Sequence, residues 1–262
     1  MRILVAGILW LSALCCLAQV RQSLPSHPNP ASKDGGVREV LESIVIPPIP
    51  DAPFTATLDT EWVRYTADGA TISLFNERRI ARDAKGRIYE ERWALAPKQA
   101  DGTVRSKLAW IQIADPKQRT LYNCSMQKQI CDLLPYDPAD DLSAASRPKP
   151  VNAANGTLTR GPVTWEDLGT RNIVGIDTAG VRETRVIAAG VMGNDLSLTG
   201  MSEYWHSDQL GINLLSIRTG PTFGKQTFTV TELTSAEPDP QLFERPAGFK
   251  VNDQRKNAPI SQ

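Results

Sequence analysis

The sequence predicts a mainly β protein: a strongly curved antiparallel sheet, an open or half barrel, with one short N-terminal helix. From Phe54 onward apolar residues recur at every second position, as in FTATLDTEW at 54–62, which is the period of a half-buried strand. Short turn sequences such as ADG at 67–69 and DAKG at 83–86 separate these stretches. Alternating stretches joined by tight turns indicate meandering antiparallel strands.

The predicted helix lies ahead of the strands, in DGGVREVLESIV at 34–45. Asp34 can cap its first turn. The following segment, IPPIPDAP at 46–53, ends the helix because its prolines cannot continue one. The apolar residues of the helix share one stripe: Val37, Val40, Leu41 and Ile44.

Residues 1–18 have the pattern of a secretory signal peptide, with Arg2 ahead of the apolar run Ile3–Leu17. The run is shorter than the ~20 residues of a membrane span, and no later segment is apolar enough to form one. Acylation at Cys15 or Cys16 is the alternative, but no small residue precedes either cysteine. We therefore expect an exported protein, in the periplasm or outside the cell, with no stable membrane span.

After the signal peptide, the composition divides the chain into three segments. Residues 19–50 are predicted as a flexible leader with the short helix, 51–251 as a single β domain and 252–262 as a tail. Within the domain, 137–163 has few large apolar residues and no period, which indicates a long loop. It is interpreted as a flap over one end of the sheet rather than a linker, because neither half has enough strands to close on itself.

Cys124 and Cys131 remain once the signal is removed. An even number of cysteines in an oxidising compartment favours a disulfide. Strand-like flanks in TLYNCSMQKQICDLL place the pair across a hairpin. A redox pair is the alternative, but such pairs usually have two residues between the cysteines.

Charge and motif content exclude several functions. Lys plus Arg number 29 and Asp plus Glu number 29, with no basic cluster of the kind that nucleic acid requires. The runs 77–79 and 90–92 mix both signs, and we expect them to form solvated strand faces. His27 and His206 are the two histidines, so neither a metal site nor a cofactor is predicted.

His206 lies in EYWHSDQLG at 203–211, which also holds two carboxylates. A catalytic base needs an orienting carboxylate and a nucleophile that converge on it. Adjacent strand residues point to opposite faces, so Glu203 cannot orient His206 across its own strand. We interpret His206 as a polar residue at a strand end, and an enzyme becomes the least favoured class.

The C-terminal part resembles a known family. DPQLFERPAGFKV at 239–251 is similar to the end of exported bacterial carriers of the lipoprotein-localisation (Lol) type. From about Asp167, LGTRNIVGIDTAGVRETR is similar to a group of uncharacterised exported bacterial proteins. The resemblance implies a half barrel whose apolar concave face holds acyl chains, with the helix at 34–45 as a plug.

The predicted function is that of an exported, non-enzymatic binding module that holds an apolar ligand or a lipoprotein segment on the concave sheet. The alternative is an envelope protein-interaction or sensor module with a filled core. The predicted partner is accordingly a lipid or other apolar ligand, or an envelope protein. Alternation within single strands gives the candidate ligand-binding residues: Trp62, Tyr89, Trp93, Ile111 and Phe228.

Overall fold

The computed structural model describes residues 44–144 and 163–255. The predicted signal peptide at 1–18, the leader and positions 34–43 of the predicted helix lie outside the described residues. Most of the predicted loop and of the predicted tail lie outside them as well. Ile44 and Val45, the last two positions of that helix, are described and are not helical.

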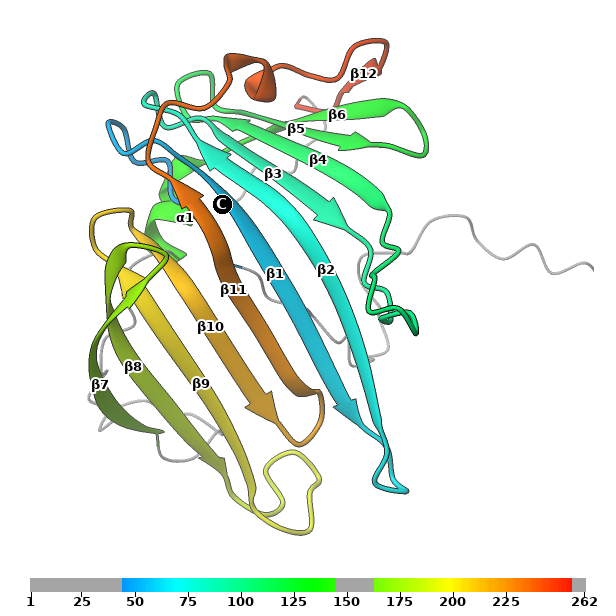
Figure 1. Ribbon diagram of the computed structural model, residues 1–262, viewed down its shortest axis with the longest axis vertical. Coiled ribbons are helices and arrows are strands. Elements are labelled where there is room, and N and C mark those ends of the chain that lie inside the picture. The colour runs from blue at the N-terminus through cyan, green and yellow to red at the C-terminus, as the bar shows by residue number, and fades with distance from the viewer. Residues whose placement is uncertain (1–43, 145–162, 256–262) are drawn as a thin grey trace, which may run out of the picture. The chain divides into compact units, whose positions relative to one another are not determined.

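Within the described residues one sheet holds twelve strands, in the order β12-β6-β5-β4-β3-β2-β1-β11-β10-β9-β8-β7 (Figure 1). All neighbouring pairs are antiparallel except β12 with β6, which is parallel. The strands are β1 (Phe54–Tyr65), β2 (Thr71–Arg82), β3 (Ile88–Trp93), β4 (Leu108–Asp115), β5 (Thr120–Ser125), β6 (Ile130–Pro135), β7 (Val163–Ile173), β8 (Ile176–Ile187), β9 (Leu198–Ser207), β10 (Ile212–Gly220), β11 (Gly224–Thr234) and β12 (Lys250–Asp253).

The prediction of a mainly β protein with a strongly curved, open antiparallel sheet is confirmed. The described part of the chain contains one α-helix, α1 (Pro138–Ala144). This helix lies inside the segment predicted as a loop. Its formation is consistent with Pro138 at the first position, where a missing N–H costs nothing, and with Asp140 and Asp141 in the first turn, where the helix dipole favours negative charge.

One face of the sheet, here called the core face, carries the largest apolar cluster. The alternation in β1 buries Phe54, Ala56 and Leu58 there, all at most 2% exposed. Phe228 and Val230 of β11 pair across from β1 and are 1% exposed. Ile44 and Ile46 belong to the same cluster, so the segment that precedes β1 covers part of this face.

Arg82 ties that preceding segment to the sheet. Its side chain is fully buried and donates to the carbonyl oxygens of Pro47, Ala52 and Leu210 at 2.8–3.0 Å. The guanidinium also lies 5.1 Å from the centroid of the Phe54 ring. Burial lowers its pKa to about 10, and the three carbonyls satisfy a cation that has left water.

The C-terminal segment packs on the opposite face. Asp239 caps the short 3₁₀ helix η2 (Pro240–Phe243) by accepting from the Gln241 amide at 2.9 Å. Phe243 is buried in a second apolar cluster with Tyr89 and Ile113. The chain then returns as β12 beside β6. The DPQLFERPAGFKV motif thus closes one edge of the sheet.

Cys124 and Cys131 are directly opposite each other in the β5–β6 hairpin, and both are fully buried. Their sulfur atoms lie 2.02 Å apart, which is a disulfide. The hairpin placement inferred from the sequence is therefore confirmed.

Candidate functional site

The predicted ligand-binding residues divide between the two faces. Trp62 and Phe228 lie on the core face, because Trp62 pairs with Gln226, two residues from Phe228 on β11. Tyr89, Trp93 and Ile111 lie on the opposite face, since Glu90 between them pairs with the core-face residue Ile80. These residues do not form one site, and their ligand-binding role stays a prediction.

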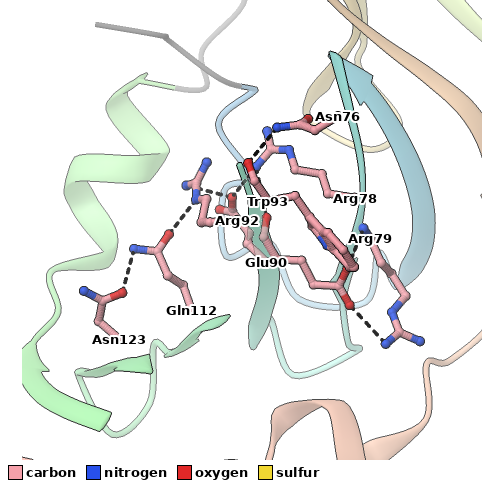
Figure 2. Close-up of polar contacts among 9 residues, drawn as sticks. Asn76, Arg78, Arg79, Glu90, Arg92, Trp93, Gln112 and Asn123 are labelled. Carbon is pink, nitrogen blue, oxygen red and sulfur yellow. Dashed lines mark hydrogen bonds and ion pairs between the residues drawn. The ribbon is translucent and has the colours of Figure 1, made fainter. Parts of the chain in front are cut away.

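The core face of β3–β5 is polar. Glu90 Oε2 lies 2.9 Å from Arg92 Nη2 and 3.7 Å from Arg78 Nη1. Arg92 Nε donates to Gln112 Oε1 at 2.8 Å, and Gln112 Nε2 donates to Asn123 Oδ1 at 3.4 Å. Figure 2 shows this chain of contacts crossing from strand to strand. These contacts link β3, β4 and β5 on a face that also carries the buried apolar residues Ile88 and Ala114.

A second polar cluster occupies the opposite face of β2 and β3. Glu91 accepts from Trp93 Nε1 at 2.7 Å, from the Tyr89 hydroxyl at 2.9 Å and from Arg79 Nη2 at 3.2 Å. Burial alone would raise the pKa of the Glu91 carboxyl, but these hydrogen bonds and the Arg79 charge hold it below its usual value. The expectation that runs 77–79 and 90–92 form solvated faces is wrong for Arg78 and Glu91, which are 5% and 8% exposed.

The β8–β9, β10–β11 and β1–β2 hairpins turn at the same end of the sheet (Figure 1). A groove of about 370 Å³ lies on the core face at the β8–β9 and β10–β11 turns and is here called the hairpin-end groove. Ile187 and Leu198, paired across β8 and β9, form one apolar wall. The lining is mixed in polarity: it includes Met192, Tyr204 and Phe223 together with Glu183, Arg185, Ser202 and Arg218.

Two glycines keep the floor of this groove low. Gly200 lies on β9 and Gly220 on the neighbouring strand β10. Both occupy positions on the core face where other residues of these strands place side chains. A Cβ atom at Gly200 would meet only the Thr219 carbonyl oxygen, at 3.7 Å. At Gly220 it would lie 2.5 Å from a carbon of the Phe223 ring, so this glycine lets the ring lie against the strand.

Hydrogen bonds fix the segments that border the groove. Asn194 Nδ2 donates to the carbonyl oxygens of Ala188 and Leu196, and Asn194 Oδ1 accepts from the Met192 amide at 2.9 Å. The β10–β11 turn is held by Trp62, whose Nε1 donates to the Phe223 carbonyl oxygen at 2.7 Å. At Gly224 the backbone has φ 82°, and a Cβ would lie 2.1 Å from the Val63 carbonyl oxygen, so that turn requires glycine.

Exposed apolar side chains gather at the same end of the sheet. Leu196 is 72% exposed, Met192 62% and Val191 42% in the β8–β9 loop. Tyr65 and Ile72, on either side of the β1–β2 turn, are 63% and 48% exposed. Of these side chains, Met192 lines the groove. Contiguous exposed apolar patches often mark interaction sites.

His206 is 5% exposed near the end of β9, as the sequence indicates. Its Nδ1 lies 3.1 Å from Asn213 Oδ1, and its Nε2 lies 3.8 Å from Asp208 Oδ1. These partners come from the same hairpin as His206. Across the described ranges, no group of three or more His, Cys, Asp or Glu side chains is arranged to hold a metal ion.

Comparison with solved structures finds distant similarities. No family model matches the sequence, and no curated protein matches it. An uncharacterized conserved protein from Thermus thermophilus is 9% identical, with a TM-score of 0.39, over 77% of this chain and 90% of that one. A LolA superfamily protein from Nitrosomonas europaea is 9% identical, with a TM-score of 0.29, over 75% of this chain and 92% of that one.

A chain of the Pseudomonas aeruginosa MucA/MucB complex is 14% identical, with a TM-score of 0.39. The match covers 77% of this chain and 58% of that one, so this chain spans little more than half of that relative. No helix within the described ranges is long and apolar enough to cross a membrane.

Sequence reasoning missed the groove. Its residues come from β8, β9, β10 and two turns, and alternation within single strands cannot show which faces coincide. One signal was present: GVMGND at 190–195 places two large apolar side chains in a turn, where they gain nothing from burial in the core. A second was glycine inside strand patterns at 200 and 220, which often marks close approach.

Proposed function

We propose that the protein is an exported, non-enzymatic binding module that holds an apolar chain, either a lipid acyl chain or a lipoprotein segment, in the hairpin-end groove. The observation that supports this most is the glycine floor beside the apolar side chains of Ile187, Met192 and Leu198. Ligand sites are typically concave and mostly apolar with a few placed polar groups. Here Arg218 stacks 5.5 Å from the Phe223 ring at the same groove.

The groove rather than the centre of the sheet is proposed because the centre is filled. Phe54, Leu58, Phe228 and Val230 are at most 1% exposed, so they line no open space. The methionine at 192 adds to the case, because its flexible, polarisable side chain adapts to varied apolar ligands.

Export is part of the proposal and rests on residues 1–18. We propose a location in the periplasm or outside the cell. A buried Cys124–Cys131 disulfide supports an oxidising compartment, because such bonds are rare where thiols are kept reduced.

The second candidate is an envelope protein-interaction or sensor module. Exposed Val191, Met192 and Leu196 favour it, because apolar side chains on an ordered loop also suit a protein partner. The two candidates differ in whether the groove itself is occupied. A small apolar ligand needs the groove, whereas a docked protein needs the loop.

The test is a titration with N-phenylnaphthylamine, an uncharged dye whose fluorescence rises in apolar surroundings. Gly200→Leu places a side chain on the groove floor without a backbone clash. We expect it to weaken binding by about tenfold or more, since two excluded methylene contacts at ~0.8 kcal/mol each exceed the 1.4 kcal/mol of one decade.

The matched control is Thr199→Leu, which adds the same side chain at the next residue, on the other side of β9 and exposed. It should bind the dye as the wild type does. Equal binding by the Gly200→Leu and wild-type proteins would contradict the groove. Loss of a protein partner on Met192→Ser, with dye binding absent in every variant, would support the interaction module instead.

A further inference from the structure

A larger cavity, of about 670 Å³, lies apart from the groove. Strands β1, β2 and β11 form part of its wall through residues of the opposite face. The rest comes from the segment 94–107, which bridges to β2 through Phe75 and Ala96. Its size is within the ~300–1,000 Å³ of small-molecule sites.

The cavity carries a surplus of negative charge. Asp59 and Glu61 of β1 and Glu77 of β2 line it, and Lys98 is the one basic side chain among the lining residues that the structure describes. Three carboxylates against one ammonium favour a cationic ligand. Hydroxyl groups of β11 lie among them, including those of Thr227 and Thr229.

Two oxygen atoms of these lining residues, Asp59 Oδ1 and Thr227 Oγ1, are buried without a hydrogen-bond partner in the described part of the chain. Both residues lie on the face of the sheet that lines the cavity, because Asp59 pairs with Thr229 and Glu61 with Thr227. Buried polar atoms in proteins are nearly always paired, and both of these oxygens can accept. A ligand group with at least two hydrogen-bond donors would satisfy them.

Aromatic rings complete the lining. Lys98 Nζ lies 4.2 Å from the centroid of Phe75, which shows that an ammonium group is favourable at this wall. Trp93 lines the same cavity, with its indole nitrogen engaged by Glu91. The ring faces suit the methylene groups of an amine ligand.

Burial raises the pKa of the Asp59 carboxyl, an effect that Lys98 opposes and Glu232 increases. The carboxylate is thus costly to keep ionised in the empty cavity. A ligand cation would lower that cost, because an opposite charge favours the ionised form.

We propose that this cavity is a second binding site, specific for a small organic amine. The ammonium group donates to Asp59 Oδ1 and to the Thr227 hydroxyl, while the carbon chain lies against Phe75 and Trp93. The site shares no residue with the hairpin-end groove, so it goes beyond the apolar binding proposed above.

The experiment is calorimetric titration of the full exported chain with putrescine, at neutral pH and low salt. Butanediol, the neutral diol of the same chain length, tests the need for charge. We expect saturable binding of putrescine and none of butanediol. Asp59→Asn should weaken putrescine binding by about tenfold or more, because it removes the carboxylate charge that pairs with the ammonium group.

Asp208→Asn is the control, since it removes the same charge from an exposed turn outside the cavity. It should leave putrescine binding unchanged, as should Gly200→Leu. If Asp59→Asn does not fold, judged by circular dichroism, Glu77→Gln replaces it at an exposed lining residue and should weaken binding several-fold. The proposal is overturned if the wild type does not bind putrescine, if butanediol binds equally, or if the cavity variants bind as Asp208→Asn does.

Discussion

Arg82 illustrates how a charged residue can belong to the core. A buried guanidinium is tolerated here because three carbonyl oxygens accept from it. Two of those carbonyls, at Pro47 and Ala52, belong to the segment before β1, and the third follows β9. The sequence alone shows Arg82 as a charged residue at the end of a predicted strand. No local pattern shows that it joins segments more than a hundred residues apart.

Arg82→Met should lower the free energy of unfolding by about 3–5 kcal/mol, because the carbonyls it satisfies would be left buried and unpaired. Urea unfolding followed by tryptophan fluorescence measures the difference. Arg245→Met is the control, since exposed Arg245 donates to one carbonyl, that of Phe249. If the two variants lose equal stability, Arg82 does not have the role described.

At the scale of elements, β3 shows why strand phase was the missing information. Its two faces both carry charge: Glu90 and Arg92 lie on the core face, and Glu91 on the other. Period-two alternation identifies the strand but not which alternate set faces the core. That choice depends on the register with β2 and β4, which are determined by contacts distant in sequence.

A short helix is also hard to recognise from the sequence. The pattern did not indicate α1 at Pro138–Ala144, because seven residues make too short a window for helical periodicity. What indicates α1 is end chemistry: proline at the start and two aspartates in the first turn. End signals alone are weak when the segment around them lacks large apolar residues.

The free energy of unfolding should depend on pH because of the β2–β3 cluster around Glu91. The folded-state pKa of Glu91 is lowered, so its stabilisation is present above the ordinary glutamate pKa and is lost as pH falls through the folded value. We expect the free energy of unfolding to fall as pH is lowered below about 5. The Glu91→Gln protein should have a lower free energy of unfolding than the wild type at neutral pH. Its free energy of unfolding should also change less as the pH is lowered below about 5.

Urea unfolding at several pH values measures both slopes. Glu244→Gln, at an exposed residue, is the control and should keep the wild-type pH dependence. A Glu91→Gln protein with the wild-type slope would show that other carboxylates control the acid response.

Across the whole molecule, the sequence was sufficient for the fold class because alternation and turn chemistry recur along most of the chain. The open sheet, the hairpin disulfide and the place of His206 follow from such local rules. The groove and the amine cavity do not, because each combines side chains from several strands and turns. Both were outside what single-strand patterns can show, even though Trp93 was selected and does line the cavity.

The central claim is that the hairpin-end groove holds an apolar chain. Photolabelling with a diazirine-bearing palmitic acid, followed by mass spectrometry of the peptides, tests it most directly. The account predicts labels on Met192, Leu198, Tyr204 or Phe223, and their loss in the Gly200→Leu protein. Labels centred on Tyr89 or Ile111, or a label pattern unchanged by Gly200→Leu, would contradict it.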